Sequence, residues 1–134
     1  MPPKRPVAEK NLPLPTAAEL DILAVLWRLG PATVREVHEG LNKDCGYTTT
    51  LKQMQVMFEK GLVIRSERFR SHVYEAGIPK GQTQTQIIGD LLSRAFEGSA
   101  SGLVLGALSA KRASRDELKE MRRMIDEFEK GMAK

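Results

Sequence analysis

The hydrophobic period of the chain changes at Gly61, and this change constrains the fold more than any other feature of the sequence. Before Gly61, apolar residues recur at helical spacing in three segments that are separated by glycine, proline or polar residues. After it, residues 62–67 and 72–76 have the pattern of two short strands, with a turn at 69–71. The sequence therefore predicts helices first and a hairpin after them.

Capping signals place the first two helices. Thr16 followed by Glu19, and Thr33 followed by Glu36, match the capping box, in which each side chain satisfies the exposed backbone N–H of the other residue. We therefore expect a helix to start at each threonine. The apolar residues at helical spacing are expected to be buried: Ile22, Leu23, Leu26 and Trp27 in the first helix, and Val34, Val37 and Leu41 in the second.

The third helix is predicted from Tyr47 to Lys60, with Gly61 as its left-handed C-terminal cap. Its buried stripe is expected to consist of Leu51, Met54 and Phe58, with Thr50 and Met57 beside it. The outward face is then expected to carry Thr48, Thr49, Lys52, Gln53, Gln55 and Val56.

Three helices followed by a two-stranded hairpin is the element order of a winged helix-turn-helix. The hairpin is the wing, and Pro31–Ala32 is placed to supply a small third strand. Trp27 is expected to anchor the first helix on the sheet. The predicted fold class is mainly α with a small β-hairpin wing, a winged helix-turn-helix followed by a C-terminal helical dimerisation domain.

The 134 residues suit one domain, or one small domain with an appendage. Residues 1–11 are rich in proline and are predicted to form a flexible arm. Residues 12–80 are predicted to form the winged helix. Pro79–Gly81 is expected to break the chain, and the helical pattern resumes at Gln82, so residues 81–134 are predicted to form a three-helix dimerisation domain.

A helix within residues 99–110 is apolar nearly all round, and such a helix is normally buried on every side. Ser114 and Glu117 open a last helix whose apolar residues follow a heptad spacing. Three short helices cannot enclose one of themselves, so we expect a homodimer; the alternative is that these helices fold back on the N-terminal domain. The predicted dimerisation residues are Leu91, Leu92, Phe96, Leu103, Leu105, Leu108, Leu118, Met121, Ile125 and Phe128.

Basic residues outnumber acidic ones by 21 to 17, and the local excess is greatest between Lys60 and Arg70. Such a run is either a solvated loop or a phosphate footprint beside a suitable fold. The third helix has a single acid, Glu59, and its threonine, glutamine and lysine side chains suit base reading, although ordinary surface polarity also explains them. The predicted DNA-binding residues are Thr48, Thr49, Lys52, Gln53, Gln55, Arg65, Arg68 and Arg70. Weaker candidates for phosphate contact are His72, Arg35, Lys4 and Arg5.

Several classes of protein are excluded by composition. Cys45 is the single cysteine, and His38 and His72 are the only histidines, so neither a disulfide scaffold nor a metal centre is expected. Cys45 is expected to be a free thiol and His38 a residue of the helix surface. There is no catalytic Cys–His–Asp set, glycine-rich phosphate loop or paired-acid pocket, so we expect no enzyme and no cofactor. No apolar run suits membrane insertion or a signal peptide, which predicts a cytoplasmic protein.

Five motifs, in the same order along the chain, resemble the penicillinase-repressor and methicillin-resistance-repressor family of bacterial transcription regulators. They are Leu-Pro-Thr-Ala-Ala-Glu-Leu-Asp-Ile-Leu at 14–23, Val-Leu-Trp-Arg-Leu-Gly-Pro-Ala-Thr-Val-Arg-Glu-Val at 25–37, Tyr-Thr-Thr-Thr-Leu-Lys at 47–52, Glu-Lys-Gly-Leu-Val at 59–63 and Ala-Phe-Glu-Gly-Ser at 95–99. The resemblance implies a dimeric repressor that binds a palindromic double-stranded DNA operator.

The resemblance also implies a membrane sensor protease pathway that cuts the middle C-terminal helix, here within 99–110, to relieve repression. The asparagine–phenylalanine bond cut in the best-known members is missing from this segment. Paired cysteines of the copper-responsive branch are missing too, so copper sensing is not expected. Val56 replaces a basic residue often found at its position in the family, which removes one candidate DNA contact.

Two functions of different classes remain to be compared. The first is a sequence-specific DNA-binding transcriptional repressor. The second is a winged-helix protein-interaction module that dimerises without sequence-specific DNA binding. They differ in salt dependence, because a DNA-binding protein loses affinity steeply as salt rises.

Overall fold

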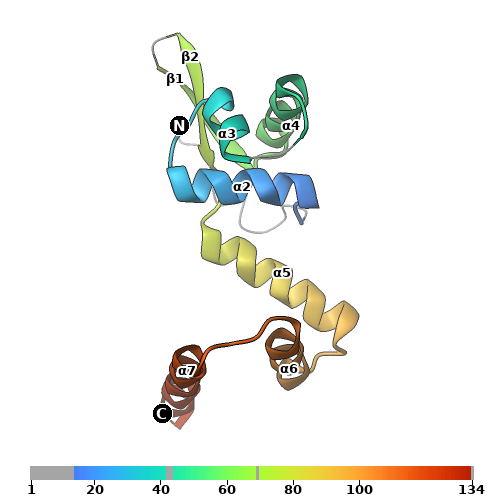
Figure 1. Cartoon of the computed structure of the whole chain (residues 1–134), viewed down its shortest axis with the longest axis vertical. Coiled ribbons are helices and arrows are strands. Elements are labelled where there is room, and N and C mark those ends of the chain that lie inside the picture. The colour runs from blue at the N-terminus through green and yellow to red at the C-terminus, as the bar shows by residue number, and fades with distance from the viewer. Residues whose placement is uncertain (1–13, 42–43, 69, 134) are drawn as a thin grey trace. The chain divides into compact units, whose positions relative to one another are not determined.

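The computed structural model describes residues 14–41, 44–68 and 70–133, so the arm predicted for residues 1–11 lies outside the described residues. The chain forms two compact units, residues 1–88 and 89–134, and helix α5 contributes to both. The elements in chain order (Figure 1) are α2 (Ala17–Leu29), α3 (Val34–Leu41), α4 (Tyr47–Lys60), β1 (Val63–Arg68), β2 (Ser71–Ala76), α5 (Lys80–Ala95), α6 (Ala100–Ala110) and α7 (Arg115–Ala133).

Both predicted capping boxes of the first two helices are confirmed. At the start of α2, the Thr16 N–H donates to Glu19 Oε1 at 3.0 Å and the Glu19 N–H donates to Thr16 Oγ1 at 3.2 Å. At the start of α3, Thr33 and Glu36 make the same pair of bonds at 2.9 and 3.2 Å. Helix α4 ends as predicted at Gly61, whose φ of 87° is the left-handed conformation that favours glycine.

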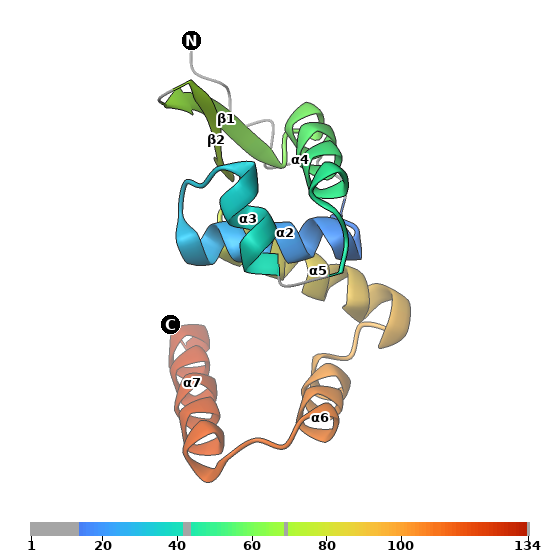
Figure 2. The same cartoon turned by 45° about the horizontal axis from the view of Figure 1, so that its top comes forward.

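The core of the first unit lies between α2 and the elements packed on it. Helix α2 contacts α3, α4 and β2, and α4 contacts β1. In Figures 1 and 2, α3, α4 and the hairpin all lie on the same side of α2. The buried apolar residues are Ile22, Leu23, Val25, Leu26, Ala32, Val34, Val37, Met54, Met57, Leu62, Val63, Val73, Tyr74 and Ile78.

The hairpin is an antiparallel pair in which Val63 lies opposite Ala76 and Arg68 opposite Ser71. The predicted third strand is reduced to one bridge: the Ala32 N–H donates to the Tyr74 carbonyl at 2.9 Å, and the Tyr74 N–H donates back at 2.8 Å. This bridge attaches the turn before α3 to the middle of β2 and completes the winged helix-turn-helix.

Trp27 is half-buried against the core rather than enclosed in it. Its indole N–H donates to the carbonyl of Ile78 at 3.1 Å. The side chain therefore ties α2 to the segment that follows β2, which refines the predicted anchor on the sheet.

The predicted buried stripe of α4 is wrong at Phe58. The buried residues of α4 are Thr50, Met54 and Met57, whereas Phe58 is 37% exposed. Its ring faces Arg65 of β1, whose guanidinium carbon lies 4.0 Å from the ring centroid. The reason is angular: Phe58 lies about 100° around the helix from Met57, so it falls at the edge of the buried face.

The predicted chain break at Pro79–Gly81 is also wrong in detail, because α5 already begins at Lys80. The Pro79 carbonyl accepts the N–H groups of Gln82 and Thr83 at 3.1 and 3.2 Å. A proline at a helix start lacks only an N–H that would have no partner there. The division into domains 12–80 and 81–134 stays a prediction.

In the second unit, Ser99 caps α6 by accepting the Gly102 N–H at 2.9 Å. The Phe96 ring lies against Gly106, where an added Cβ would come within 3.3 Å of it, so glycine permits this approach. Ser114 accepts the Glu117 N–H at 3.0 Å, which is half of the predicted capping box. Within the described part of the chain, no helix is long and apolar enough to cross a membrane.

An ion pair between a buried carboxylate and an exposed lysine joins the start of α2 to the end of α4. Glu19 is 2% exposed, and its Oε2 lies 2.6 Å from Lys60 Nζ. Burial alone would raise the pKa of the Glu19 carboxyl. The hydrogen bonds from the Lys60 ammonium and the Thr16 N–H outweigh burial and hold this pKa below its ordinary value.

We expect Glu19→Gln to lower the free energy of unfolding by about 2 kcal/mol at pH 7, because the amide loses the charge-assisted bond to Lys60. A lowered folded-state pKa contributes stability above the ordinary carboxyl pKa of about 4.3, and this stability is lost as the pH falls through the folded pKa. The difference in free energy of unfolding between wild type and variant, measured by urea unfolding, should therefore become smaller as the pH is lowered.

Glu36→Gln is the matched control for this prediction. Glu36 has the same capping role in α3 but is exposed, and glutamine also serves in a capping box. We expect it to change the urea midpoint little at any pH. Equal losses in both variants at pH 7 would show that the pair with Lys60 contributes nothing beyond the cap.

Candidate nucleic-acid interface

The outward face of α4 is mostly as predicted. Thr48, Thr49, Lys52, Gln55 and Val56 are exposed, and Gln53 is half-buried. The first turn contains no acid, and the N-cap, Gly46, has no capping side chain. The Thr49 and Thr50 N–H groups donate to the Gly46 carbonyl at 3.1 and 3.3 Å. No acidic side chain of the first turn opposes an anion at the positive end of the helix dipole.

The wing presents its arginines in two ways. Arg65 is exposed, and its guanidinium stacks over the exposed Phe58 ring of α4. Arg68 and Arg70 are exposed at the end of the hairpin, and Arg70 has a φ of 67° in the tight turn. The structure thus brings Arg65 to α4 and leaves Arg68 and Arg70 free to reach away from it.

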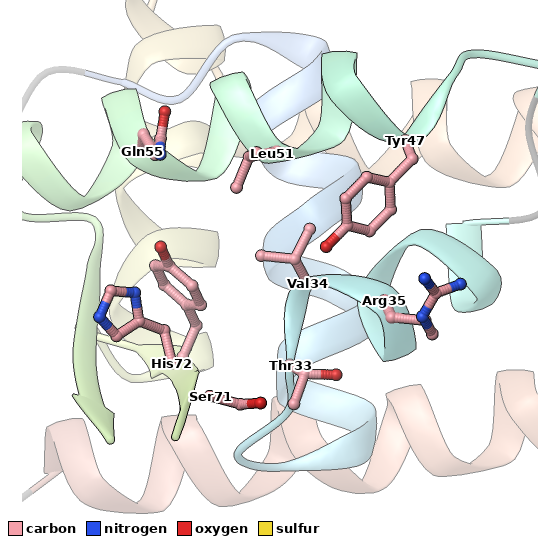
Figure 3. Close-up of a pocket in the computed structure, with 9 residues that line it drawn as sticks. Thr33, Val34, Arg35, Tyr47, Leu51, Gln55, Ser71 and His72 are labelled. Atoms are coloured by element: carbon pink, nitrogen blue, oxygen red, sulfur yellow. The ribbon is translucent and has the colours of Figure 1, made fainter. Parts of the chain in front are cut away.

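A hollow of about 400 Å³ lies between α3, α4 and β2 (Figure 3). Tyr47 and Arg35 lie on one side of it and His72 on the other (Figure 3). The Arg35 guanidinium carbon is 5.4 Å from the centroid of the Tyr47 ring, within the range of a cation–π contact. The residues that line the hollow are Thr33, Val34, Arg35, Tyr47, Leu51, Gln55, Ser71, His72 and Tyr74.

Sequence reasoning missed the role of His38, which was expected to be a plain surface residue. His38 is half-buried, and its Nδ1 lies 2.9 Å from the Oγ1 of buried Thr50. The two residues are 12 apart and on different helices, so no helical spacing connects them. Cys45 is a free thiol, as predicted.

The predicted dimerisation residues lie on the helices as expected, and none of them is buried in the single chain. Among them, Leu105 is 65% exposed, Ile125 56% and Phe128 76%. Phe96 also packs within its own chain, against Gly106. Leu91 is exposed, and the half-buried members are Leu92, Phe96, Leu103, Leu108, Leu118 and Met121.

The groups exposed on α4 and the wing are suited to the recognition of an anion. In residues 14–41, 44–68 and 70–133, no three His, Cys, Asp or Glu side chains come together as metal ligands would. Arginine, lysine, hydroxyl and amide groups surround α4 and the wing, and these are the groups that contact phosphates and base edges.

The helix-turn-helix, its exposed acid-poor second helix and the basic hairpin define the class of winged-helix DNA-binding proteins. The penicillinase repressor family model matches residues 15–127. The chain therefore belongs to the penicillinase repressor family and is a DNA-binding transcriptional repressor, which confirms the function predicted from the sequence. The same finding confirms that the chain is not an enzyme.

Two relatives and one solved structure illustrate the similarity. The chain is 32% identical over 116 residues to "Transcriptional regulator BlaI" of Mycobacterium tuberculosis, covering 84% of this chain and 83% of that protein. It is 23% identical over 120 residues to "Penicillinase repressor" of Bacillus licheniformis, covering 88% and 94%. A MarR family protein from Bacillus stearothermophilus aligns with a TM-score of 0.48 at 20% identity, covering 89% of this chain and 76% of that one.

Proposed function

We propose that the protein acts as a homodimer that reads a palindromic operator, with α4 of each copy in the major groove. The observation that carries this proposal is the exposed face of α4, where Thr48, Thr49 and Lys52 stand free and the single acid, Glu59, lies in the last turn. In a helix-turn-helix the residues near the start of the second helix reach base edges. Threonine and lysine can bond to those edges, and the threonine methyl can meet a thymine methyl.

The hollow beside α4 is suited to the sugar–phosphate backbone at the edge of the groove. Arg35 and the hydroxyl groups of Tyr47 and Ser71 can donate to phosphate oxygens there. Arg68 and Arg70 extend the basic surface at the end of the wing. Such contacts fix the register of the protein on the duplex without carrying sequence information.

The second unit supports the dimer because it cannot form a core alone. No residue of 89–132 is buried in the single chain, although large apolar side chains occur along all of its helices. Exposed apolar surface of this kind marks an interface, and a two-fold dimer is the commonest way to cover it. The two-fold axis of such a dimer matches the palindrome.

The test is fluorescence anisotropy with two duplexes of equal length, a palindrome from the promoter region of the protein's own gene and a random sequence. At physiological salt we expect binding about a thousandfold tighter to the palindrome. Affinity for both should fall steeply as salt rises. Equal and salt-insensitive binding would favour the alternative, a protein-interaction module.

A membrane sensor protease pathway stays a prediction of the family resemblance. Helix α6 and the residues around it carry no asparagine–phenylalanine bond. Incubation of the repressor with membranes from induced cells, followed by mass measurement, would reveal a cut elsewhere in the chain.

A further inference from the structure

Thr50 is a polar residue buried in the first half of the recognition helix α4, with 1% of its surface exposed. A buried hydroxyl without a partner is costly, so its surroundings decide how well the helix is held. Its Oγ1 lies 2.9 Å from His38 Nδ1, and the weaker contact to Cys45 Sγ is 3.7 Å long. The bond to His38 joins α4 to the preceding helix α3.

His38 makes a second contact to the start of α4. Its ring meets Tyr47 edge-on, with centroids 5.9 Å apart and an interplanar angle of 81°. The other neighbour of the Tyr47 ring is Arg35 of α3. One α3 side chain therefore touches both Tyr47 and Thr50, and the two residues between them are Thr48 and Thr49.

The local capping of α4 makes this contact more important. The N-cap is Gly46, which has no side chain to accept the exposed N–H groups of the first turn. Glycine is tolerated at an N-cap, but it lacks the side-chain hydrogen bond that Ser, Thr, Asn or Asp would add. The Gly46 carbonyl accepts the N–H groups of Thr49 and Thr50. Side-chain contacts to this turn come from α3, through His38 and Arg35.

We propose that His38 is a positioning residue for DNA reading: it fixes the first turn of α4 so that Thr48 and Thr49 meet the bases in one orientation. This inference rests on the proposed function, in which α4 enters the major groove. His38 is half-buried and need not touch the DNA itself. Precise placement matters because contact groups must be held to within about 0.5 Å of their binding geometry.

The experiment compares His38→Ala with His38→Asn in the full-length protein. Asparagine places an amide where Nδ1 of histidine lies and so can keep the bond to Thr50. By anisotropy, we expect His38→Ala to bind the palindromic duplex about tenfold more weakly, with little change on random DNA, and His38→Asn to recover most of the loss. Amide hydrogen exchange of residues 47–50 should be faster in His38→Ala than in wild type.

Glu39→Ala is the matched control, since Glu39 is exposed on the same helix beside His38. We expect Glu39→Ala to leave unchanged the ratio of the affinities for the palindromic and the random duplex. Thr50→Val removes the hydroxyl while keeping the shape, and it should mimic His38→Ala. The double variant His38→Ala with Thr50→Val should bind the palindrome no more weakly than His38→Ala alone, because His38→Ala already removes the bond to Thr50.

If His38→Ala prefers the palindromic duplex over random DNA as strongly as the wild type does, the inference is overturned and the proposed function stands. Equal losses on both duplexes, or no recovery in His38→Asn, would also overturn it. If His38→Ala does not fold, Thr50→Val decides, and unchanged preference in that variant contradicts the inference. A wild type that does not prefer the palindrome overturns the proposed function, and this inference with it.

Discussion

Phe128→Glu is expected to convert the protein from a dimer to a monomer and to weaken operator binding by about 100-fold or more. Phe128 is 76% exposed on α7 in the single chain, in a row with Leu118, Met121, Ile125 and Met132. A carboxylate in the centre of a buried apolar seam is left without a partner, which the dimer cannot tolerate. Each monomer then binds a single half-site, without the added affinity that a dimer gains by binding two half-sites at once.

Light scattering with size-exclusion chromatography measures the first effect, and anisotropy on the palindromic duplex measures the second. Lys130→Glu is the control, because it introduces the same residue two positions away, on the opposite face of α7. It should remain dimeric. A dimeric Phe128→Glu protein would contradict the interface and favour the alternative that these helices fold back on the N-terminal domain.

Lys52→Ala is expected to cost about 1–3 kcal/mol on the palindromic duplex, with a much smaller loss on random DNA. Lys52 is exposed on the outward face of α4, one turn beyond Thr48 and Thr49, where its ammonium can reach guanine. Thr49→Ala should behave in the same way. Competition anisotropy against both duplexes separates the loss of preference from the loss of affinity.

Arg68→Ala provides the contrast, since Arg68 is exposed on the wing and is proposed to meet phosphate. Arg68→Ala should weaken binding to both duplexes alike. It should also reduce the steepness of the plot of log affinity against log salt concentration by about one. Equal losses of affinity on both duplexes in Lys52→Ala would instead show that Lys52 contacts the DNA backbone. The threonines and glutamines of α4 would then be the residues that read the bases.

Local signals predicted the winged helix from the sequence because each is read within one helical turn or one strand. The two Thr–Glu capping boxes bond as expected, and Gly61 ends α4 at the predicted residue. The family motifs then predicted the repressor function. The start of α5 was misplaced because Pro79 and Gly81 can stand at a helix start as well as break a chain.

The sequence by itself determined where helices and strands form, since caps, glycine and hydrophobic period act over a few residues. Only the tertiary structure decided which distant side chains meet. Glu19 pairs with Lys60, 41 residues away, and His38 bonds to Thr50 across two helices. Phe58, which was predicted to be buried, lies at the edge of the buried face of α4, and its ring meets Arg65 of β1 there instead of the core. These contacts depend on how packed elements are oriented, and no short-range pattern encodes that orientation.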